Sequence, residues 1–145
     1  MINDSRLIND FMPHHIYQLL KSALQEKKID SQRAKIAILG YSYIGNSDDT
    51  RNSPTEKLIE ILDRAKIKYK IHDPFVSQFN RESAIDIISQ SDAIMLMTSH
   101  SRYRNLALEK IADIVKNKII IDGRNFFDSK KVKKLGFLYK GIGNI

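Results

Sequence analysis

The segment 35–56, KIAILGYSYIGNSDDTRNSPTE, constrains the fold of this chain more than any other. It begins with the apolar run IAIL at 36–39, which is too short and too uninterrupted for a surface helix and is typical of a strand buried on both faces. Gly40 ends the run, and SPTE at 53–56 then has the pattern of a capping box with proline at the first helical position. A buried strand, a glycine turn and a capped helix predict the start of a βαβ unit.

Short apolar runs and helical patterns alternate along the rest of the chain. We expect further strands at 68–72, 93–97, 118–121 and 137–139, and helices from 54 and at 83–91, 106–115 and 129–134. Strands that are separated by helical crossovers predict a doubly wound parallel sheet with helices on both faces. The predicted fold class is therefore α/β, a three-layer Rossmann-like domain.

The first part of the chain differs from this pattern and predicts one amphipathic helix ahead of the α/β domain. Pro13 is expected in the first turn of that helix. Its apolar positions share one face and are Ile16, Leu19, Leu20, Ala23 and Leu24. We therefore divide the chain into a helical segment, 1–33, and an α/β domain, 34–145. The apolar stripe must pack on the domain, on a partner subunit or on a missing part of the protein, and we favour the last two.

Composition narrows the classes of function. The 145 residues suit one domain, and the absence of cysteine excludes disulfides, thiolate metal sites and a cysteine nucleophile. The histidines do not have metal-ligand spacing, so no metal site is expected. No apolar run approaches the length of a bilayer span and the N-terminus does not resemble a signal peptide, so we expect no membrane association and a cytoplasmic location.

The formal net charge of +7 suggests anionic partners without identifying them. Much of the excess lies in late lysines, at Lys130, Lys131, Lys133, Lys134 and Lys140. We interpret them as a solvated helix face and tail. The alternatives are nucleotide phosphates and nucleic acid, and we rank nucleic acid last because no aromatic residues interleave with these lysines.

Ligands of doubly wound sheets bind beyond the carboxyl ends of the strands, where the strand order reverses. The candidate positions are therefore the loop that starts at Gly40, Asp73, the segment 98–100 and the segment 122–124. Of these, His100 ends one predicted strand and is a candidate for ligand contact.

The loop after Gly40 is neither a full dinucleotide fingerprint nor a P-loop, because it has only one further glycine, Gly45, and no following Lys-Ser/Thr. Asp48 and Asp49 would repel a phosphate, so Arg51 must dominate any anion site there. The alternative is that one of these aspartates caps the turn and pairs with Arg51.

Arg124 follows Asp122-Gly123 directly at the end of a predicted buried strand. A planar guanidinium there suits a phosphate or the edge of a uracil or ribose. The structural alternative, which the sequence leaves open, is that Arg124 pairs with Asp122 or a neighbouring carboxylate.

Several blocks of the chain follow one another in a recognisable order. They are NDFMP at 9–13, LG at 39–40, NSDDTRNSP at 46–54, HDP at 72–74, IDGRNFFD at 121–128, GF at 136–137, Tyr139 and GIG at 141–143. In this order they resemble the UDP-binding C-terminal domain of the UDP-glucose/GDP-mannose dehydrogenase family, the nucleotide-sugar 6-dehydrogenases. The full enzymes of that family add an N-terminal NAD domain, a central dimerisation region and a catalytic cysteine.

The resemblance implies that the chain binds a UDP-sugar, with Tyr43, Ile44 and Arg124 in contact with the substrate. Ile44 stands where the family often has lysine, so it can supply neither a cation nor a proton. Arg51 would reach towards NAD across an interdomain cleft, and no catalytic residue is expected in this chain.

The same resemblance makes segment 1–33 a remnant of the dimerisation region and implies a homo-oligomer or association with a chain that carries the NAD domain. The alternative is a non-catalytic oligomerisation or regulatory module that retains the fold.

Overall fold

The computed structural model describes residues 4–142, with side chains from residue 12 onward. Residues 1–3 and 143–145, which include Gly143 of the last matching block, lie outside the described residues. One parallel sheet has the strand order β2-β1-β3-β4-β5. Its strands are β1 (Lys35–Leu39), β2 (Lys68–His72), β3 (Ala93–Leu96), β4 (Ile119–Asp122) and β5 (Leu138–Gly141). The predicted doubly wound parallel sheet is confirmed.

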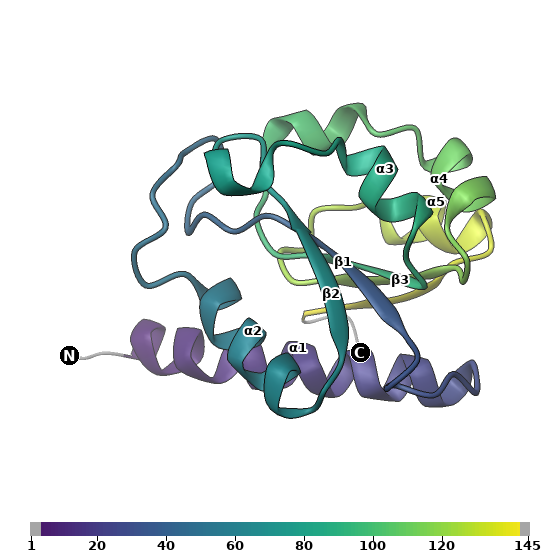
Figure 1. Cartoon of the computed structure of the whole chain (residues 1–145), viewed down its shortest axis with the longest axis horizontal. Coiled ribbons are helices and arrows are strands. Elements are labelled where there is room, and N and C mark those ends of the chain that lie inside the picture. The colour runs from purple at the N-terminus through teal and green to yellow at the C-terminus, as the bar shows by residue number, and fades with distance from the viewer. Residues whose placement is uncertain (1–3, 143–145) are drawn as a thin grey trace.

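Helices cover both faces of this sheet, as Figure 1 shows. The helical elements are α1 (Asp4–Glu26), α2 (Pro54–Arg64), η1 (Ser77–Phe79), α3 (Ala84–Ser89), η2 (Ser101–Asn105), α4 (Leu108–Ile114) and α5 (Ser129–Lys134). Alternate residues of β1 enter different cores: Ile36 and Ile38 pack with α1 and α2, whereas Ala37 and Leu39 pack with α3, α4 and α5. Burial on both faces explains the uninterrupted apolar run, and the three-layer prediction is confirmed.

The start of α2 forms as the sequence indicates. Pro54 is the first helical residue, and the hydroxyl oxygen of Ser53 accepts a hydrogen bond from the Thr55 backbone N–H at 3.1 Å.

In the part of the chain that the structure describes, no helix combines the length and hydropathy needed to cross a membrane.

The position of Pro13 in α1 differs from the prediction. The helix begins at Asp4, so Pro13 lies inside it and not in its first turn. A proline removes one backbone hydrogen bond, but it does not end a helix whose remaining turns are held by packing. Pro13 is itself buried, on the side of α1 that meets the domain.

The expected partner of the α1 stripe was also wrong. Ile16, Leu20, Ala23 and Leu24 are at most 1% exposed and belong to the same core as α2 and the sheet. The physical reason is the width of the sheet, because α2 alone cannot cover that face of β3 and β4. An ion pair of 2.6 Å between Lys140 of β5 and Glu26 fixes the end of α1 against the domain.

Candidate functional site

The strand order reverses at β1, whose neighbours β2 and β3 both follow it in sequence. The loop that leaves β1 projects from the left-hand end of the sheet in Figure 1. We call the segments 40–53, 98–101 and 123–125, which follow the carboxyl ends of β1, β3 and β4, the rim. This is the position at which doubly wound sheets bind their ligands.

Gly40 brings the loop of the rim against the end of β3. Its φ of +105° is strained for any residue with a side chain, and an added Cβ would lie 2.4 Å from the Cβ of Thr98. Its N–H donates to the carbonyl oxygen of His72 at 2.7 Å. The Thr98 hydroxyl donates to the Ser42 carbonyl oxygen at 2.7 Å, so the loop is tied to both neighbouring strands.

Asp73, directly after β2, holds the same loop from the other side. Its Oδ2 accepts hydrogen bonds from the backbone N–H groups of Tyr41 at 2.7 Å and Ser42 at 2.9 Å. The same oxygen lies 2.9 Å from Nε2 of His100, and Nδ1 of His100 accepts from the Asn46 N–H at 2.8 Å. Because Nδ1 is the acceptor, the neutral ring carries its proton on Nε2 and donates it to Asp73.

Both side chains of this pair are fully buried. Burial raises the pKa of Asp73, but hydrogen bonds from His100 and from the backbone N–H groups of Ser42, Tyr41 and Phe75 outweigh it and lower that pKa to about 2. The carboxylate is therefore charged at neutral pH and acts as an anchor for the loop. His100, a candidate for ligand contact from the sequence, has both ring nitrogens engaged inside the protein.

Arg124 connects β3 with the loop. Its Nε donates to the Met97 carbonyl oxygen at 2.9 Å, and Nη2 donates to the Tyr43 carbonyl oxygen at 2.9 Å. These contacts confirm that Arg124 and the loop after Gly40 lie at a common edge of the sheet. Burial lowers the pKa of Arg124, although the side chain keeps its charge at neutral pH.

The alternative pairing of the Arg124 guanidinium with Asp122 is not what the structure shows. Asp122 Oδ1 accepts from the Arg124 backbone N–H at 3.0 Å. Asp122 Oδ2 accepts from the Phe126 and Phe127 backbone N–H groups and from the Tyr139 hydroxyl, each at 2.8 Å. Asp122 therefore shapes the turn that presents the guanidinium and leaves it to contact carbonyl groups.

Three of the four predicted site residues, Tyr43, Ile44 and Arg51, line an open hollow of about 370 Å³. Arg124 does not line it and meets this group through the Tyr43 carbonyl oxygen. The Ile44 side chain is 58% exposed. Arg51 makes a bidentate pair with Asp49, with both N···O distances at 3.0 Å, which agrees with the structural alternative proposed for this pair.

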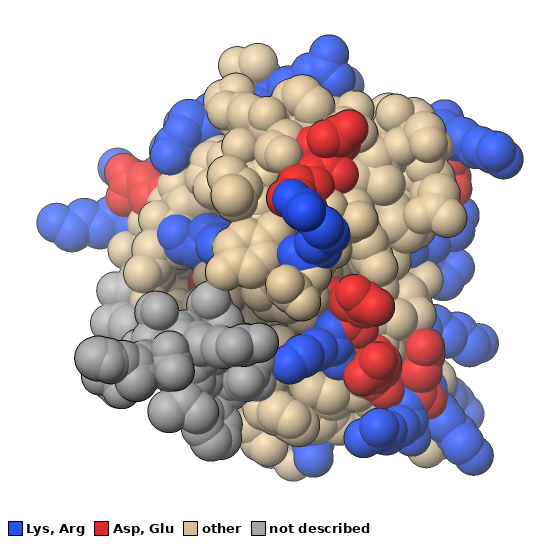
Figure 2. All heavy atoms as spheres, turned by 90° about the vertical axis from the view of Figure 1, so that its left-hand side faces the viewer, with Lys and Arg blue, Asp and Glu red and all other residues tan. Residues whose placement is uncertain are grey.

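The charges around this hollow are balanced. Hydrogen bonds from the side chain and backbone of Arg51 lower the pKa of Asp49 to about 2. Figure 2 looks onto this end of the molecule and shows acidic and basic side chains interleaved over the part drawn in colour. The described residues also contain no group of three or more His, Asp or Glu side chains placed to hold a metal ion. A ligand at the rim must therefore be recognised by a few individual side chains and not by an overall excess of charge.

The comparisons with known proteins agree on one family. The sequence model for the UDP-glucose/GDP-mannose dehydrogenase family, UDP binding domain, matches residues 37–129. The UDP-N-acetyl-D-mannosamine dehydrogenases of Pyrococcus horikoshii and Methanococcus vannielii are 37% and 35% identical to this chain, each over 99% of it. The UDP-glucose 6-dehydrogenase of Rickettsia conorii is 33% identical over 79% of it.

Solved structures give the same result. The UDP-D-ManNAc dehydrogenase of Pyrococcus horikoshii superimposes with a TM-score of 0.87 and 38% identity over 95% of this chain and 32% of its own length. The NDP-N-acetyl-D-galactosaminuronic acid dehydrogenase of Methanosarcina mazei also has a TM-score of 0.87, at 33% identity over 95% of this chain. The chain spans about a third of the curated relatives, 33% and 34% of the first two. By sequence and architecture it belongs to the UDP-glucose/GDP-mannose dehydrogenase family and corresponds to the UDP-binding domain of these enzymes.

Proposed function

We propose that this chain binds the nucleotide part of a UDP-sugar at the rim and positions the sugar for oxidation by groups outside the chain. The observation that supports this most strongly is the placement of Arg124. Its guanidinium uses two of five N–H donors on protein carbonyl groups, which leaves three for a ligand. A planar donor group fixed in this way suits a diphosphate or a uracil edge.

The neighbouring groups would complete the contact. Tyr43 and Ile44 offer partly exposed apolar surface beside the hollow, which suits a base or a sugar ring. Ile44 carries no charge, so Arg124 or a group beyond this chain must balance the charge of the diphosphate. The contribution of the chain is orientation of the substrate, not covalent chemistry.

For the whole protein we propose oxidation of a UDP-hexose to the uronate, by analogy with the dehydrogenases it matches. NAD would accept the hydride in that reaction. The first βα turn, with Gly40 and Gly45 alone, does not fit a dinucleotide fingerprint, so the described residues do not offer NAD its main site. The Arg51 guanidinium is exposed and paired with Asp49. It would release Asp49 and pair with NAD across the interdomain cleft.

Assembly follows from the same proposal. The chain would form a homo-oligomer or associate with a chain that carries the NAD domain, in the cytoplasm, and only the second arrangement would supply the NAD site. Because the apolar stripe of α1 is buried in the domain, such an interface must use other surfaces.

Isothermal titration calorimetry tests the proposal. UDP should bind the chain with saturable heat and more tightly than inorganic pyrophosphate or ADP. Equal affinities for UDP and pyrophosphate would show that only the charge is recognised and would contradict the proposal.

Replacing Arg124 by alanine should weaken UDP binding by about 2–5 kcal/mol, the cost of truncating one partner of a buried charged contact. Arg124→Lys is the matched control, because it keeps the charge but loses the planar fork, and it should fall between wild type and alanine. Thermal unfolding of both variants reports any loss of the contact with the Tyr43 carbonyl group. Undiminished UDP binding by the alanine variant would remove Arg124 from the site.

Replacing Arg51 by alanine should leave UDP affinity within about twofold of wild type and should hardly change the unfolding midpoint, because its pair with Asp49 is exposed to solvent. Calorimetry on this variant separates the proposed role towards NAD from one towards UDP. A loss as large as that of Arg124→Ala would assign Arg51 to the substrate.

A non-catalytic oligomerisation or regulatory module is the second candidate. The observation that favours it is the 58% exposure of Ile44, an apolar side chain in the position expected to contact the substrate. Gel filtration with and without a UDP-sugar separates the two functions, since such a module should associate regardless of the ligand.

A further inference from the structure

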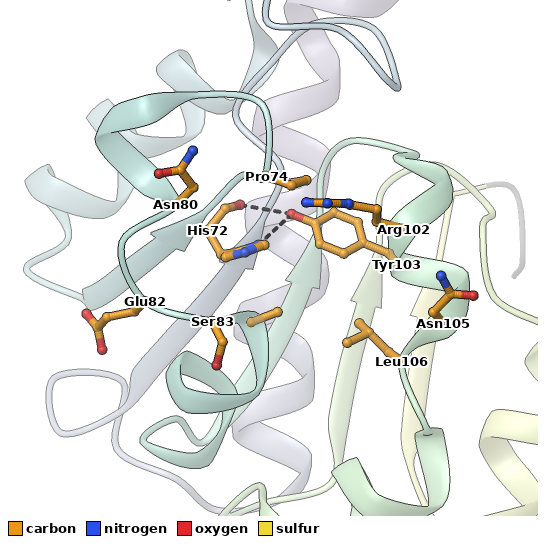
Figure 3. A pocket seen from close by; sticks show the side chains of 10 residues that line it. His72, Pro74, Asn80, Glu82, Ser83, Arg102, Tyr103, Asn105 and Leu106 are labelled. Carbon is orange, nitrogen blue, oxygen red and sulfur yellow. Dashed lines mark hydrogen bonds between the residues drawn. The ribbon is translucent and has the colours of Figure 1, made fainter.

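A second and larger cavity, of about 680 Å³ and as open to solvent as the hollow beside Tyr43, lies at the carboxyl end of β2 on the side of the sheet that α3 covers. Figure 3 shows its wall, built from the end of β2, the loop before α3 and the short helix η2. None of its lining residues lines the hollow beside Tyr43. Its polar lining groups come from His72, Asn80, Glu82, Ser83, Arg102 and Asn105.

His72 presents a hydrogen-bond acceptor to this cavity. The Tyr103 hydroxyl has one hydrogen, and we assign it to the His72 carbonyl oxygen at 3.0 Å, which can only accept. The 3.0 Å contact between the same hydroxyl oxygen and His72 Nδ1 is then a hydrogen bond only if Nδ1 carries the proton. Burial lowers the pKa of His72, so the ring is neutral at pH 7 and Nε2 accepts. Nε2 has no partner among the described residues, and the ring lines the cavity.

Arg102, which comes from η2, supplies a positive charge to the lining. Its guanidinium forms no hydrogen bond or ion pair within the described residues, and Figure 3 shows it beside the hydroxyl end of Tyr103. Glu82, the carboxylate of the lining, is already engaged by the Lys70 ammonium group at 3.1 Å and the Gln90 amide at 3.3 Å. An anion that enters the cavity would therefore meet the unpaired Arg102 guanidinium and the Glu82 carboxylate, whose charge Lys70 balances.

The remaining polar groups suit hydroxyls. The Ser83 oxygen accepts from the Asp86 N–H at 3.1 Å, so its own hydrogen is available to a ligand. The amides of Asn80 and Asn105 can each donate and accept. The volume lies within the range of small-molecule sites, on the order of 300–1,000 Å³.

We propose that this cavity is a second ligand site, for a small polyhydroxylated anion such as a sugar phosphate or a sugar acid. The phosphate or carboxylate group pairs with Arg102, and a ligand hydroxyl donates to Nε2 of His72. Tyr103 connects this site to the rim, because its ring packs against His100 at 5.6 Å between centroids. The proposal does not depend on UDP binding at the rim.

Nuclear magnetic resonance of the full 145-residue chain tests this site, with glucose 6-phosphate and gluconate as the two probes. Either probe should shift the amide signals of residues 83 and 102–105 in a saturable way, and the His72 Nε2 signal should move as it accepts a hydrogen bond. If only glucose 6-phosphate saturates, the site recognises a sugar phosphate. If only gluconate saturates, it recognises a sugar acid. Glucose itself and inorganic phosphate should each bind more weakly than the better probe.

Arg102→Gln should weaken the better probe about 10- to 100-fold, as expected when one charge-assisted hydrogen bond is removed. Arg81→Gln is the matched control, since Arg81 is exposed nearby but does not line the cavity, and it should bind as wild type does. Any of four results would overturn the proposal: neither probe saturates, glucose binds as well as they do, the two variants behave alike, or free His72 carries its proton on Nε2.

Discussion

Asp73→Ala should lower the free energy of unfolding by about 3–5 kcal/mol, because it removes a buried carboxylate and leaves several buried N–H donors without an acceptor, each at about 1–3 kcal/mol. Those donors are the backbone N–H groups of Tyr41 and Ser42 and the His100 ring. Urea denaturation at pH 7 measures the change. Asp48→Ala is the matched control, an exposed carboxylate on the loop that Asp73 holds, and should change little. Equal stability of the two variants would show that Asp73 does not anchor the loop.

The same carboxylate should make stability depend on pH. Its pKa is about 2 in the folded chain, below the ordinary 3.8, so its contribution is complete above about pH 4 and is lost as the pH falls towards 2. The shift corresponds to about 2 kcal/mol. The stability difference between wild type and Asp73→Asn should therefore shrink over that range. A difference that stays constant from pH 5 to pH 2 would contradict the lowered pKa.

Gly40→Ala should destabilise the chain by about 3 kcal/mol or more, because it adds backbone strain at positive φ to a steric clash. The φ is +105°, and the new Cβ would lie 2.4 Å from Thr98. Gly136→Ala separates the two causes: its φ is +94°, but its new Cβ would come no closer than 3.4 Å to the flexible end of Lys118. Gly136→Ala should therefore show the cost of the backbone strain alone. Thermal or urea unfolding of the two variants measures both losses of stability. Equal losses would mean that the contact with β3 is not tight.

The sheet was predictable because its strands are buried on both faces. That burial requires continuous apolar runs, such as 36–39 and 93–97, and the helical patterns between them require parallel crossovers. The order β2-β1-β3-β4-β5 was not predictable, because buried strands look alike in sequence and their neighbours are chosen by packing.

The helix α1 shows where a pattern stops being informative. Its stripe predicted burial correctly, but a stripe does not identify the surface that covers it. Only the folded domain shows that α2 leaves part of β3 and β4 for α1 to cover. The packing that allows Pro13 inside the helix is also a property of the folded domain.

The rim was located from sequence because the carboxyl ends of parallel strands meet at one edge, which brought Arg124 beside the loop after Gly40. The roles of Asp73 and His100 could not be predicted from the sequence, because they depend on hydrogen bonds between residues far apart in the chain. The available signal was an aspartate directly after a strand next to the glycine turn. The cavity beside His72 had no sequence signal, since its lining comes from loops.

The central claim is that a uridine nucleotide binds at the rim, and mapping of amide chemical shifts during titration with UDP tests it most directly. The expected result is saturable shifts in residues 41–46, 98–101 and 123–126, reduced in Arg124→Ala, with residues 83 and 102–105 little changed. Shifts confined to the cavity beside His72, or no saturable shift at the rim, would contradict the claim.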